Sequence, residues 1–225
     1  MNYNNEELEK YVSVIETIGG FVGRVPHNHI NVLPVIMNSM IDECKVYFEI
    51  GTYHGSSIIT SMRFNGKCKF YGLDFFGKGD NDEWSTRWGN QSALDNLNIH
   101  IVNNNIQKAN VNEQEFELIQ GDSQSEETIN LINERFFEIV DILFIDGDHS
   151  FDGVRNDFNN YKNLVRSGGY IIFDDYGFLP DVRKAVNLID KKEFDIIGRL
   201  PLVNGNQFVN ELDEQLNASF ILRKK

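Results

Sequence analysis

Two short apolar runs that each end in acidic residues constrain what this chain can fold into. The first has the sequence DILFIDGDHS and spans residues 141–150, and the second has the sequence GGYIIFDDY and spans residues 168–176. Short runs rich in Ile and Phe and bounded by turn residues are typical of strands that are buried on both faces of a parallel sheet. We therefore expect an α/β fold.

The acidic residues that end these runs are expected to gather at one rim of the sheet. In open α/β sheets, ligands bind just beyond the carboxyl ends of the strands. Carboxylates that converge there repel one another unless a cation, a proton or a cationic ligand offsets their charge. The residues expected at this rim are Asp146, Asp148, His149, Asp174 and Asp175. The pattern predicts a functional site.

Further apolar stretches extend the α/β pattern over most of the chain. Strands are expected at residues 46–50, 69–74, 115–122, 140–146, 170–174, 194–199 and 218–223. Helices are expected at residues 56–64, 125–137, 151–165 and 181–189, and another is expected to begin within residues 92–96. Gly168 and Gly169 are expected to stop the helix that starts at Phe151, because glycine commonly follows the end of a helix.

The residues before this pattern predict a small appendage. Apolar residues at helical spacing predict helices at residues 6–18 and 32–42, which make a helical N-terminal cap of residues 1–44. Residues 45–225 then form the main domain, and the chain as a whole is expected to be a single structural domain. His27 and His29 lie between the cap helices, where they either contact a substrate or are merely exposed.

Charge and cysteine content limit the expected partners and location. The formal net charge is -13 and the basic residues cluster only at Arg223–Lys225, so neither nucleic acid nor an anionic membrane is an expected partner. No segment has the pattern of a signal peptide or a membrane span. Cys44 and Cys68 lack motif spacing, so we expect both to be reduced in a cytoplasmic protein. The sequence does not decide whether the protein forms a homo-oligomer.

A turn that contains two glycines follows the first strand. Glu49, Gly51, Gly55 and Ser57 form the pattern E-x-G-x-x-x-G-x-S where the strand passes into a helix. Glycine lets the backbone approach a ligand closely, and a helix N-terminus offers free N–H groups. The spacing differs from the G-x-G-x-x-G pattern of dinucleotide binders. A plain tight turn explains the segment almost as well as a ligand site.

Acidic residues also end the next two strands. Asp74 lies 19 residues after Gly55, where a carboxylate can hold both hydroxyls of a ribose. Asp122 and Ser123 end the third strand, where the carboxylate can accept a hydrogen bond from an amino group. Each acid by itself is explained equally well as a helix or turn cap. Acids at three successive strand ends favour a binding role over coincidence.

Residues 46–176 resemble the class I S-adenosylmethionine-dependent methyltransferases. The most specific likeness lies in IDGDH at residues 145–149 and FDDY at residues 173–176, which are similar to a metal-dependent sugar O-methyltransferase subgroup that includes macrocin-type enzymes and cephalosporin-hydroxylase-like proteins. The resemblance implies a Rossmann-like fold, with a seven-stranded, mostly parallel sheet whose last strand is antiparallel and helices on both faces. It also implies cofactor contacts from Glu49, Gly51, Thr52, Gly55, Ser56, Asp74, Asp122, Ser123 and Asp146.

The same resemblance distributes roles along the cofactor. It places Glu49, Gly51 and Gly55 at the methionine end of S-adenosylmethionine. It places Asp74 at the ribose, and the pair Asp122 and Ser123 at the adenine. These roles follow from the likeness to the family, and the residues alone do not establish them.

The resemblance further implies a divalent metal and a general base. Asp146, Asp174 and Asp175 match a metal site, and hard carboxylate oxygens suit Mg²⁺. His149 matches the general base of some relatives, whereas others use an acid at the position of Asp148. A metal that holds two vicinal acceptor oxygens would lower the hydroxyl pKa, and a neutral imidazole could then take the proton. The plainer alternative is structural: Asp148 would cap a helix, and Asp174 and Asp175 would only form a turn.

The resemblance constrains the identity of the methyl acceptor least. The subgroup suggests a sugar or glycan hydroxyl, and a phenol or another small-molecule hydroxyl remains open. A long polar loop at residues 75–89 carries Trp84, Arg87 and Trp88, which either stack on such an acceptor or pack against the sheet.

Two other functions are compatible with an α/β sheet of this kind. A nucleotide-dependent oxidoreductase would share the ribose-binding acid, but it would lack a use for the acidic cluster. A cofactor- or metal-binding module without turnover would share every motif named above.

Overall fold

The computed structural model describes Leu33, Ile36, Met37, Met40 and residues 42–77, 97–110, 113–200, 203–204, 207–208 and 219–225. Several sequence predictions lie outside these residues: the helix at 6–18, most of the cap helix at 32–42, the helix start within 92–96, and the roles of His27, His29, Trp84, Arg87 and Trp88. Among the described residues, no helix has the length and apolar character needed to cross a membrane.

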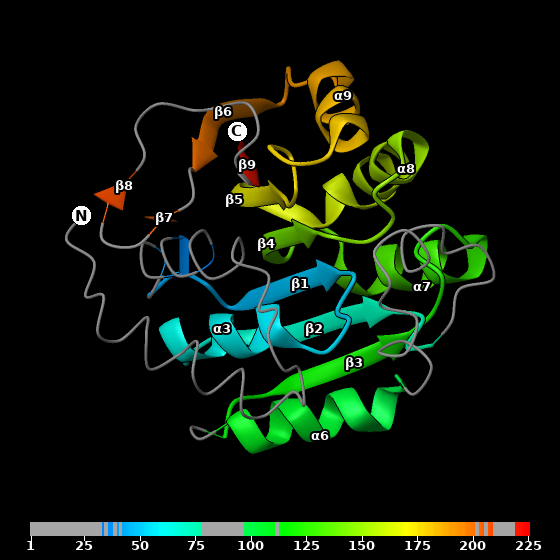
Figure 1. Ribbon diagram of the computed structural model, residues 1–225, viewed down its shortest axis with the longest axis vertical. Helices are drawn as coiled ribbons and strands as arrows, with labels where there is room; N and C mark the ends of the chain where they lie inside the picture. The colour runs from blue at the N-terminus through cyan, green and yellow to red at the C-terminus, as the bar shows by residue number, and fades with distance from the viewer. Residues whose placement is uncertain are drawn as a thin grey trace.

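A seven-stranded sheet forms the centre of the described structure (Figure 1). Its strands in chain order are β1 (Val46–Ile50), β2 (Lys69–Asp74), β3 (Phe116–Gln120), β4 (Val140–Ile145), β5 (Val165–Phe173), β6 (Phe194–Leu200) and β9 (Ser219–Lys224). Their order across the sheet is β3-β2-β1-β4-β5-β9-β6. Neighbours from β3 to β5 pair in parallel, and β9 pairs antiparallel with both β5 and β6. This confirms the predicted sheet and its antiparallel last strand.

A separate short hairpin accompanies the sheet. Its strands β7 (Val203–Asn204) and β8 (Gln207–Phe208) pair antiparallel.

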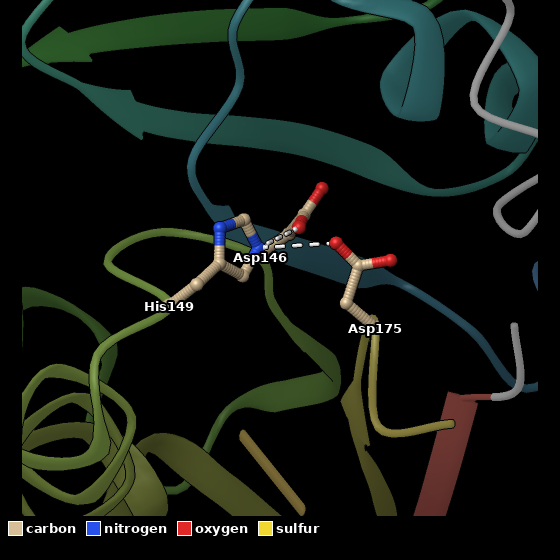
Figure 2. Close-up of side chains that lie close together, drawn as sticks. All are labelled: Asp146, His149 and Asp175. Atoms are coloured by element: carbon tan, nitrogen blue, oxygen red, sulfur yellow. Dashed lines mark hydrogen bonds and ion pairs between the residues drawn. The ribbon is translucent and has the colours of Figure 1, made fainter. Parts of the chain in front are cut away.

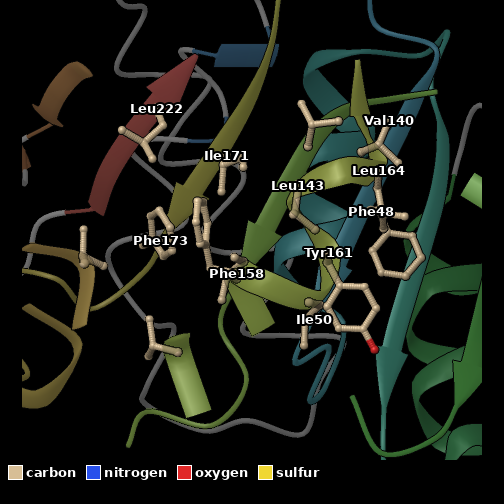
Figure 3. Packing of buried hydrophobic residues seen from close by; sticks show 14 of the residues in the cluster. Phe48, Ile50, Val140, Leu143, Phe158, Tyr161, Leu164, Ile171, Phe173 and Leu222 are labelled. Atoms are coloured by element: carbon tan, nitrogen blue, oxygen red, sulfur yellow. The ribbon is translucent and has the colours of Figure 1, made fainter. Parts of the chain in front are cut away.

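Helices cover both faces of the sheet and bury a core on each. The helices are α3 (Ser56–Phe64), α6 (Ile99–Ala109), α7 (Glu126–Phe136), α8 (Phe151–Tyr161) and α9 (Pro180–Leu188), with a 3₁₀ turn η1 (Lys162–Leu164). The first core contains side chains from α3 and α6, and the second, part of which Figure 3 shows, contains side chains from α7, α8 and α9. In β4, Ile142 and Phe144 belong to the first core, whereas Leu143 and Ile145 belong to the second. The strand is apolar throughout because successive side chains point to opposite, equally covered faces.

The boundary between α8 and β5 differs from the sequence prediction. The helix ends at Tyr161, and β5 already begins at Val165, so Gly168 and Gly169 lie inside the strand rather than after the helix. The pairing of β5 with β4 shifts register at this point, and Gly168 has a φ of 82°. A left-handed residue at such an irregularity favours glycine. The glycine pair therefore marks an irregular strand start and not a helix stop.

The helix α6 was missed by the sequence analysis. It has the sequence IHIVNNNIQKA, which is rich in Asn, a residue of low helix propensity. Val102 and Ile106 are nonetheless buried in the first core, one helical turn apart. Asn98 caps the helix, because its side chain accepts hydrogen bonds from the N–H groups of His100 and Ile101. Tertiary packing and this cap outweigh the weak propensity.

The expectation that both cysteines are reduced is wrong for this structure. Cys44 and Cys68 form a disulfide, and their Cα atoms lie 5.6 Å apart. Each residue comes just before one of the paired strands β1 and β2, and the N–H of Lys69 donates to the carbonyl oxygen of Lys45 at 2.8 Å. This pairing brings together two cysteines whose sequence spacing matches no motif, at a Cα separation that a disulfide commonly spans.

A buried carboxylate holds the amino ends of the central strands. Asp141 is 2% exposed and accepts hydrogen bonds from the N–H groups of Lys45 at 2.7 Å and Val46 at 2.8 Å. It also forms an ion pair with Arg166, at the start of β5. One side chain of β4 thereby ties β1 and β5 to it, at the edge of the sheet opposite the acidic rim.

We expect Asp141→Ala to lower the free energy of unfolding by roughly 3 kcal/mol, because it leaves the N–H groups of Lys45 and Val46 without their buried acceptor and removes the ion pair with Arg166. Urea denaturation followed by circular dichroism measures the change. Glu117→Ala is the matched control, since its ion pair with Arg135 is solvent-exposed, and it should cost less than about 1 kcal/mol. Equal losses for the two variants would show that Asp141 does not hold the strands together.

Candidate active site

The carboxyl ends of the parallel strands form the rim on which the candidate site is built. In the strand register, Ile50 pairs with Ile145, and Ile145 pairs with Phe173. The N–H of Asp146 donates to the carbonyl oxygen of Ile50 at 2.9 Å, and the N–H of Asp174 donates to that of Ile145 at 3.1 Å. These bonds continue the sheet one residue further, so the first acid after β4 and the first acid after β5 lie side by side.

Asp146, His149 and Asp175 converge at this rim, as Figure 2 shows. The Nε2 atom of His149 lies 3.0 Å from Oδ1 of Asp146 and 3.5 Å from Oδ2 of Asp175. One potential ligand atom from each of the three residues lies within 4.8 Å of the others. Asp175 has a φ of 52°, a left-handed conformation that is uncommon for residues other than glycine. Such strained residues cluster at functional sites.

Asp174 occupies a different environment from these three residues. It is 3% exposed, and its Oδ1 atom accepts a hydrogen bond from the hydroxyl of Ser219, the first residue of β9, at 2.9 Å. Side chains of successive residues at a strand end point in different directions. The geometric cluster therefore contains Asp146 and Asp175 from the expected metal trio, with His149 in the third place.

The charge on His149 depends on the carboxylates around it. Burial lowers the pKa of His149, but the hydrogen bond that its ring N–H donates to Asp146 and the negative charges of Asp146, Asp175 and Asp174 outweigh it and raise the pKa to about 9. The imidazolium then balances the acids that surround it. A divalent cation bound to these carboxylates would neutralise the same charges and lower the pKa of His149.

The donor set fits a divalent metal. Carboxylate oxygens suit Mg²⁺ and Mn²⁺, and an imidazole nitrogen adds a ligand that later transition metals also accept. The cluster is partly buried, with exposed side-chain fractions of 18% for His149, 16% for Asp146 and 14% for Asp175. A partly open cluster of this kind leaves room for water or substrate oxygens on an ion.

The glycine turn after β1 lies directly against the acidic rim. Gly51 has a φ of 89°, and a Cβ atom on it would lie 1.9 Å from the main-chain oxygen of Asp146. Only glycine fits this close approach. Gly55, with a φ of 86°, caps α3 without a side-chain hydrogen bond, and Ser56 is the first residue of that helix. The glycine turn that leads into α3 therefore contacts the loop that carries Asp146 and His149 of the acidic cluster.

The two other residues of this segment that we expected to bind cofactor are buried. Glu49 is 0% exposed, and its Oε2 atom accepts a hydrogen bond from the hydroxyl of Tyr47 at 2.7 Å. Thr52 is 2% exposed and lies so close to β2 that a Cβ atom on Gly72 would lie 2.3 Å from its hydroxyl oxygen. The side chain of Glu49 is therefore held within β1, and that of Thr52 packs against β2.

Asp74 links the glycine turn to the end of β2. Its two carboxylate oxygens accept hydrogen bonds from the N–H groups of Tyr53 at 2.7 Å and Phe76 at 2.8 Å. Both of these residues have positive φ angles. Burial raises the pKa of Asp74 above its ordinary value, although hydrogen bonds from the backbone oppose the shift. An ionised carboxylate has about four lone-pair sites, so Asp74 retains capacity to accept hydrogen bonds from a ligand.

Asp122 and Ser123 follow β3 and are held in a tight turn. The Oδ1 atom of Asp122 accepts a hydrogen bond from the N–H of Gln124 at 2.8 Å. The hydroxyl of Ser123 donates to Oδ1 of Asp157 at 2.8 Å, and the hydroxyl of Tyr161 donates to the main-chain oxygen of Ser123 at 2.6 Å. Asp157 was not among the site residues predicted from the sequence. The sequence feature that could have identified it is an acidic residue on the otherwise apolar face of α8.

Asp148 forms a hydrogen bond to the residue that caps α8. Its Oδ1 atom accepts a hydrogen bond from the N–H of Ser150 at 2.8 Å, and Ser150 caps the helix by accepting from the N–H of Gly153 at 3.0 Å. A Cβ atom on Gly153 would lie 2.3 Å from the carboxyl carbon of Asp148. The structure therefore brings His149 into the acidic cluster, and it places the exposed Asp148 at the helix cap that the plainer reading expected.

Known proteins share this fold and the segment that carries the site. Residues 48–176 match a family model described as a methyltransferase domain. An uncharacterized protein of Acanthamoeba polyphaga mimivirus is 34% identical over 215 residues, which cover 89% of this chain and 89% of that protein. The chain is similar in fold to an O-methyltransferase from Bacillus cereus in complex with SAH, with a TM-score of 0.63 and 18% identity over 100% of this chain and 93% of that one.

A second solved structure contains both a cofactor product and a metal. The methyltransferase MycE from the mycinamycin biosynthetic pathway, in complex with Mg, SAH and mycinamycin VI, has a TM-score of 0.56 and 19% identity over 96% of this chain and 54% of MycE. At such identities the structural likeness concerns the fold. The family match is more specific, because it extends from β1 to the residue that follows Asp174 and Asp175. The chain therefore belongs to this family of methyltransferases.

Proposed function

We propose that this methyltransferase transfers the methyl group of S-adenosylmethionine to a hydroxyl of a small molecule or a glycan, with the help of a divalent metal. The observation that carries the proposal is the convergence of Asp146, His149 and Asp175 at the rim of the sheet, in contact with the glycine turn. In-line methyl transfer chiefly requires that acceptor, methyl carbon and sulfur be aligned. A site in which the cofactor turn touches the acidic cluster brings donor and acceptor together.

The cofactor is assigned to the strand ends from β1 to β3. Glu49, Gly51, Thr52, Gly55 and Ser56 would contact or support its methionine end, Asp74 its ribose, and Asp122 and Ser123 its adenine. The fold that the chain shares with an SAH-bound O-methyltransferase supports this placement. The main-chain contact between Gly51 and Asp146 supports it further, because it puts the methionine end next to the metal-binding acids.

Asp146 and Asp175 are the proposed metal ligands, since both the motif and the geometry select them. Bound Mg²⁺ or Mn²⁺ would hold the acceptor oxygen and lower the pKa of its hydroxyl. For the third ligand there are two candidates, Asp174 from the motif and His149 from the geometry. We assign Asp174, and we assign His149 to the removal of the acceptor's proton, which a neutral imidazole can accept.

The proposed acceptor is a neutral or cationic hydroxyl compound. The net charge of -13 disfavours nucleic acid, whose phosphates would be repelled. Phe75 and Phe178 follow the ends of β2 and β5 and are 51% and 41% exposed. Exposed aromatic rings at this rim suit stacking against a sugar or an aryl ring.

The proposed activity can be tested directly with methyl-labelled S-adenosylmethionine. The protein is incubated with fractionated small-molecule and glycan extracts in the presence of Mg²⁺, and any labelled product is identified by mass spectrometry. We expect the label on an oxygen of a small molecule or glycan. Label on nitrogen or carbon, or on nucleic acid alone, would contradict the proposed acceptor class.

We expect Asp74→Ala to weaken binding of S-adenosylhomocysteine by roughly 1.5–3 kcal/mol, the range for hydrogen bonds to charged groups. Isothermal titration calorimetry measures the affinity. Glu115→Gln, at the opposite end of the sheet and exposed, should leave it unchanged. An Asp74→Ala protein that binds as tightly as the wild type would remove the ribose assignment.

Chelation should separate catalysis from cofactor binding. With an acceptor from the labelling screen, activity should disappear in EDTA and return with Mg²⁺ or Mn²⁺, while S-adenosylhomocysteine binding persists. Asp175→Ala should lose Mn²⁺ binding, followed by electron paramagnetic resonance, and added metal should not restore its activity. Asp190→Ala, an exposed acid paired with Lys192, is the control. Full methyl transfer by thoroughly chelated protein would refute the metal role.

The role of His149 follows from two measurements on one variant. His149→Ala should lower turnover by about 10²-fold or more, as expected for loss of a general base, while Mn²⁺ affinity stays near that of the wild type. A large loss of Mn²⁺ affinity would instead identify His149 as a metal ligand. If Asp148→Asn is inactive and His149→Ala is active, the base is Asp148.

A further inference from the structure

Two side chains of α8 hold the turn after β3 through different atoms of Ser123. Asp157 and Tyr161 lie one helical turn apart, so they point in the same direction. Oδ1 of Asp157 accepts a hydrogen bond from the hydroxyl of Ser123 at 2.8 Å. The hydroxyl of Tyr161 donates to the main-chain oxygen of the same serine at 2.6 Å. The side chain and the main chain of Ser123 are therefore both fixed by one helix.

The same carboxyl group also contacts the loop after β4. A Cβ atom on Gly147 would lie 3.1 Å from Oδ2 of Asp157, so the loop passes close to that oxygen. Next to it, the side-chain amide of Asn156 donates to Oε1 of Gln124 at 3.1 Å. Asp157 thus lies where the turn that follows β3 meets the loop that carries Asp146 and His149.

Burying a carboxyl group at this junction is unfavourable for the fold. Asp157 is 0% exposed, and Oδ2 has no hydrogen-bond partner among the described residues. Burial raises the pKa of Asp157 to about 7, against the opposing hydrogen bond from Ser123, and the charges of Asp148 and Asp122 raise it further. Its helix neighbours Val154 and Phe158 belong to the apolar second core. A buried, incompletely satisfied polar group in a native structure calls for an explanation.

We propose that Asp157 is a positioning residue for recognition of the cofactor's adenine ring, which it orients by holding Ser123. The inference rests on the proposed function, in which Asp122 and Ser123 contact the adenine. Hydrogen bonding to a base edge requires donors and acceptors at fixed positions. The internal hydrogen bonds of the turn after β3 join Asp122 to Gln124 and Ser125, whereas the side chain of Ser123 is bonded to α8. Asp157 and Tyr161 supply that rigidity from the helix behind it.

Tyr161 contributes to both the core and the turn. Its ring packs in the second core near Ile50 and Leu143 (Figure 3), while its hydroxyl reaches the main chain of Ser123. The position of α8 against the sheet is thereby transmitted to the turn. Asp157 adds a hydrogen bond that depends on the side chain of Ser123. Substitution of Asp157 or Ser123 therefore removes this bond without removing the bond from Tyr161.

The test compares binding of S-adenosylhomocysteine with that of S-inosylhomocysteine, in which a carbonyl oxygen replaces the adenine amino group. Calorimetry gives both dissociation constants for each variant. The wild type should prefer S-adenosylhomocysteine by about tenfold or more, a ratio that one or two ordinary hydrogen bonds support. Asp157→Ala should bring this ratio close to one. Asp157→Asn, whose amide oxygen can still accept from Ser123, should restore most of it.

Further variants separate positioning from general damage to the fold. Ser123→Ala should lower the ratio at least as much as Asp157→Ala does, and the double variant should lose no more than Ser123→Ala alone, because Asp157 acts only through that serine. Val154→Ala removes a buried group of α8 that does not contact Ser123, and it should lower the melting temperature while the ratio stays unchanged. If Asp157→Ala does not fold, Ser123→Ala and Tyr161→Phe carry the test.

The outcomes distinguish this inference from the proposed function. Wild-type protein that does not bind S-adenosylhomocysteine overturns the proposed function, and this inference with it. Wild-type protein that binds but does not discriminate between the two ligands overturns the inference alone. The same holds if the wild type discriminates and Asp157→Ala or Ser123→Ala retains the full ratio.

Discussion

The parallel pairing of β1, β4 and β5 is the constraint on which the remaining structure depends. It aligns the ends of three strands, and the hydrogen bonds at Asp146 and Asp174 extend this alignment beyond the sheet. The contact between Gly51 and the main chain of Asp146 exists only because β1 and β4 are neighbours. Carboxylates on adjacent strand ends repel each other in isolation. The fold therefore holds together groups whose charges oppose their approach, and the imidazole of His149 contacts two of these carboxylates.

The two ends of β4 carry acidic residues with different roles. Asp141 is the second residue of β4, and its carboxylate oxygens accept hydrogen bonds from backbone N–H groups and pair with Arg166, which joins the strands. Asp146 follows the other end, where its neighbours are His149 and Asp175. The apolar residues between them are covered on both faces. Acids of the same type thus play a structural role at one edge and lie in the candidate site at the other.

The sequence predicted the sheet well because both-face burial leaves a plain signal in short apolar runs such as those of β4 and β5. It predicted the rim acids for the same reason, since they end those runs. Local patterns failed where distant residues decide the outcome. The helix α6 depends on packing rather than on its Asn-rich sequence, Cys44 and Cys68 meet only through strand pairing, and Gly168 marks an irregular strand. The hydrogen bond between Ser219 and Asp174 and the buried contacts of Asp157 join segments whose spacing forms no motif.

The insertion of β9 between β5 and β6 has a consequence for the order in which the protein is assembled. β9 follows β6 in the chain, yet β6 reaches the sheet only through β9. During synthesis β5 and β6 therefore lack their native neighbour until β9 has been made. Asp174 acquires the hydroxyl of Ser219 at the same moment. Because exposed strand edges invite pairing with other chains, the late arrival of β9 leaves the edge beside the candidate active site open to misassembly during synthesis.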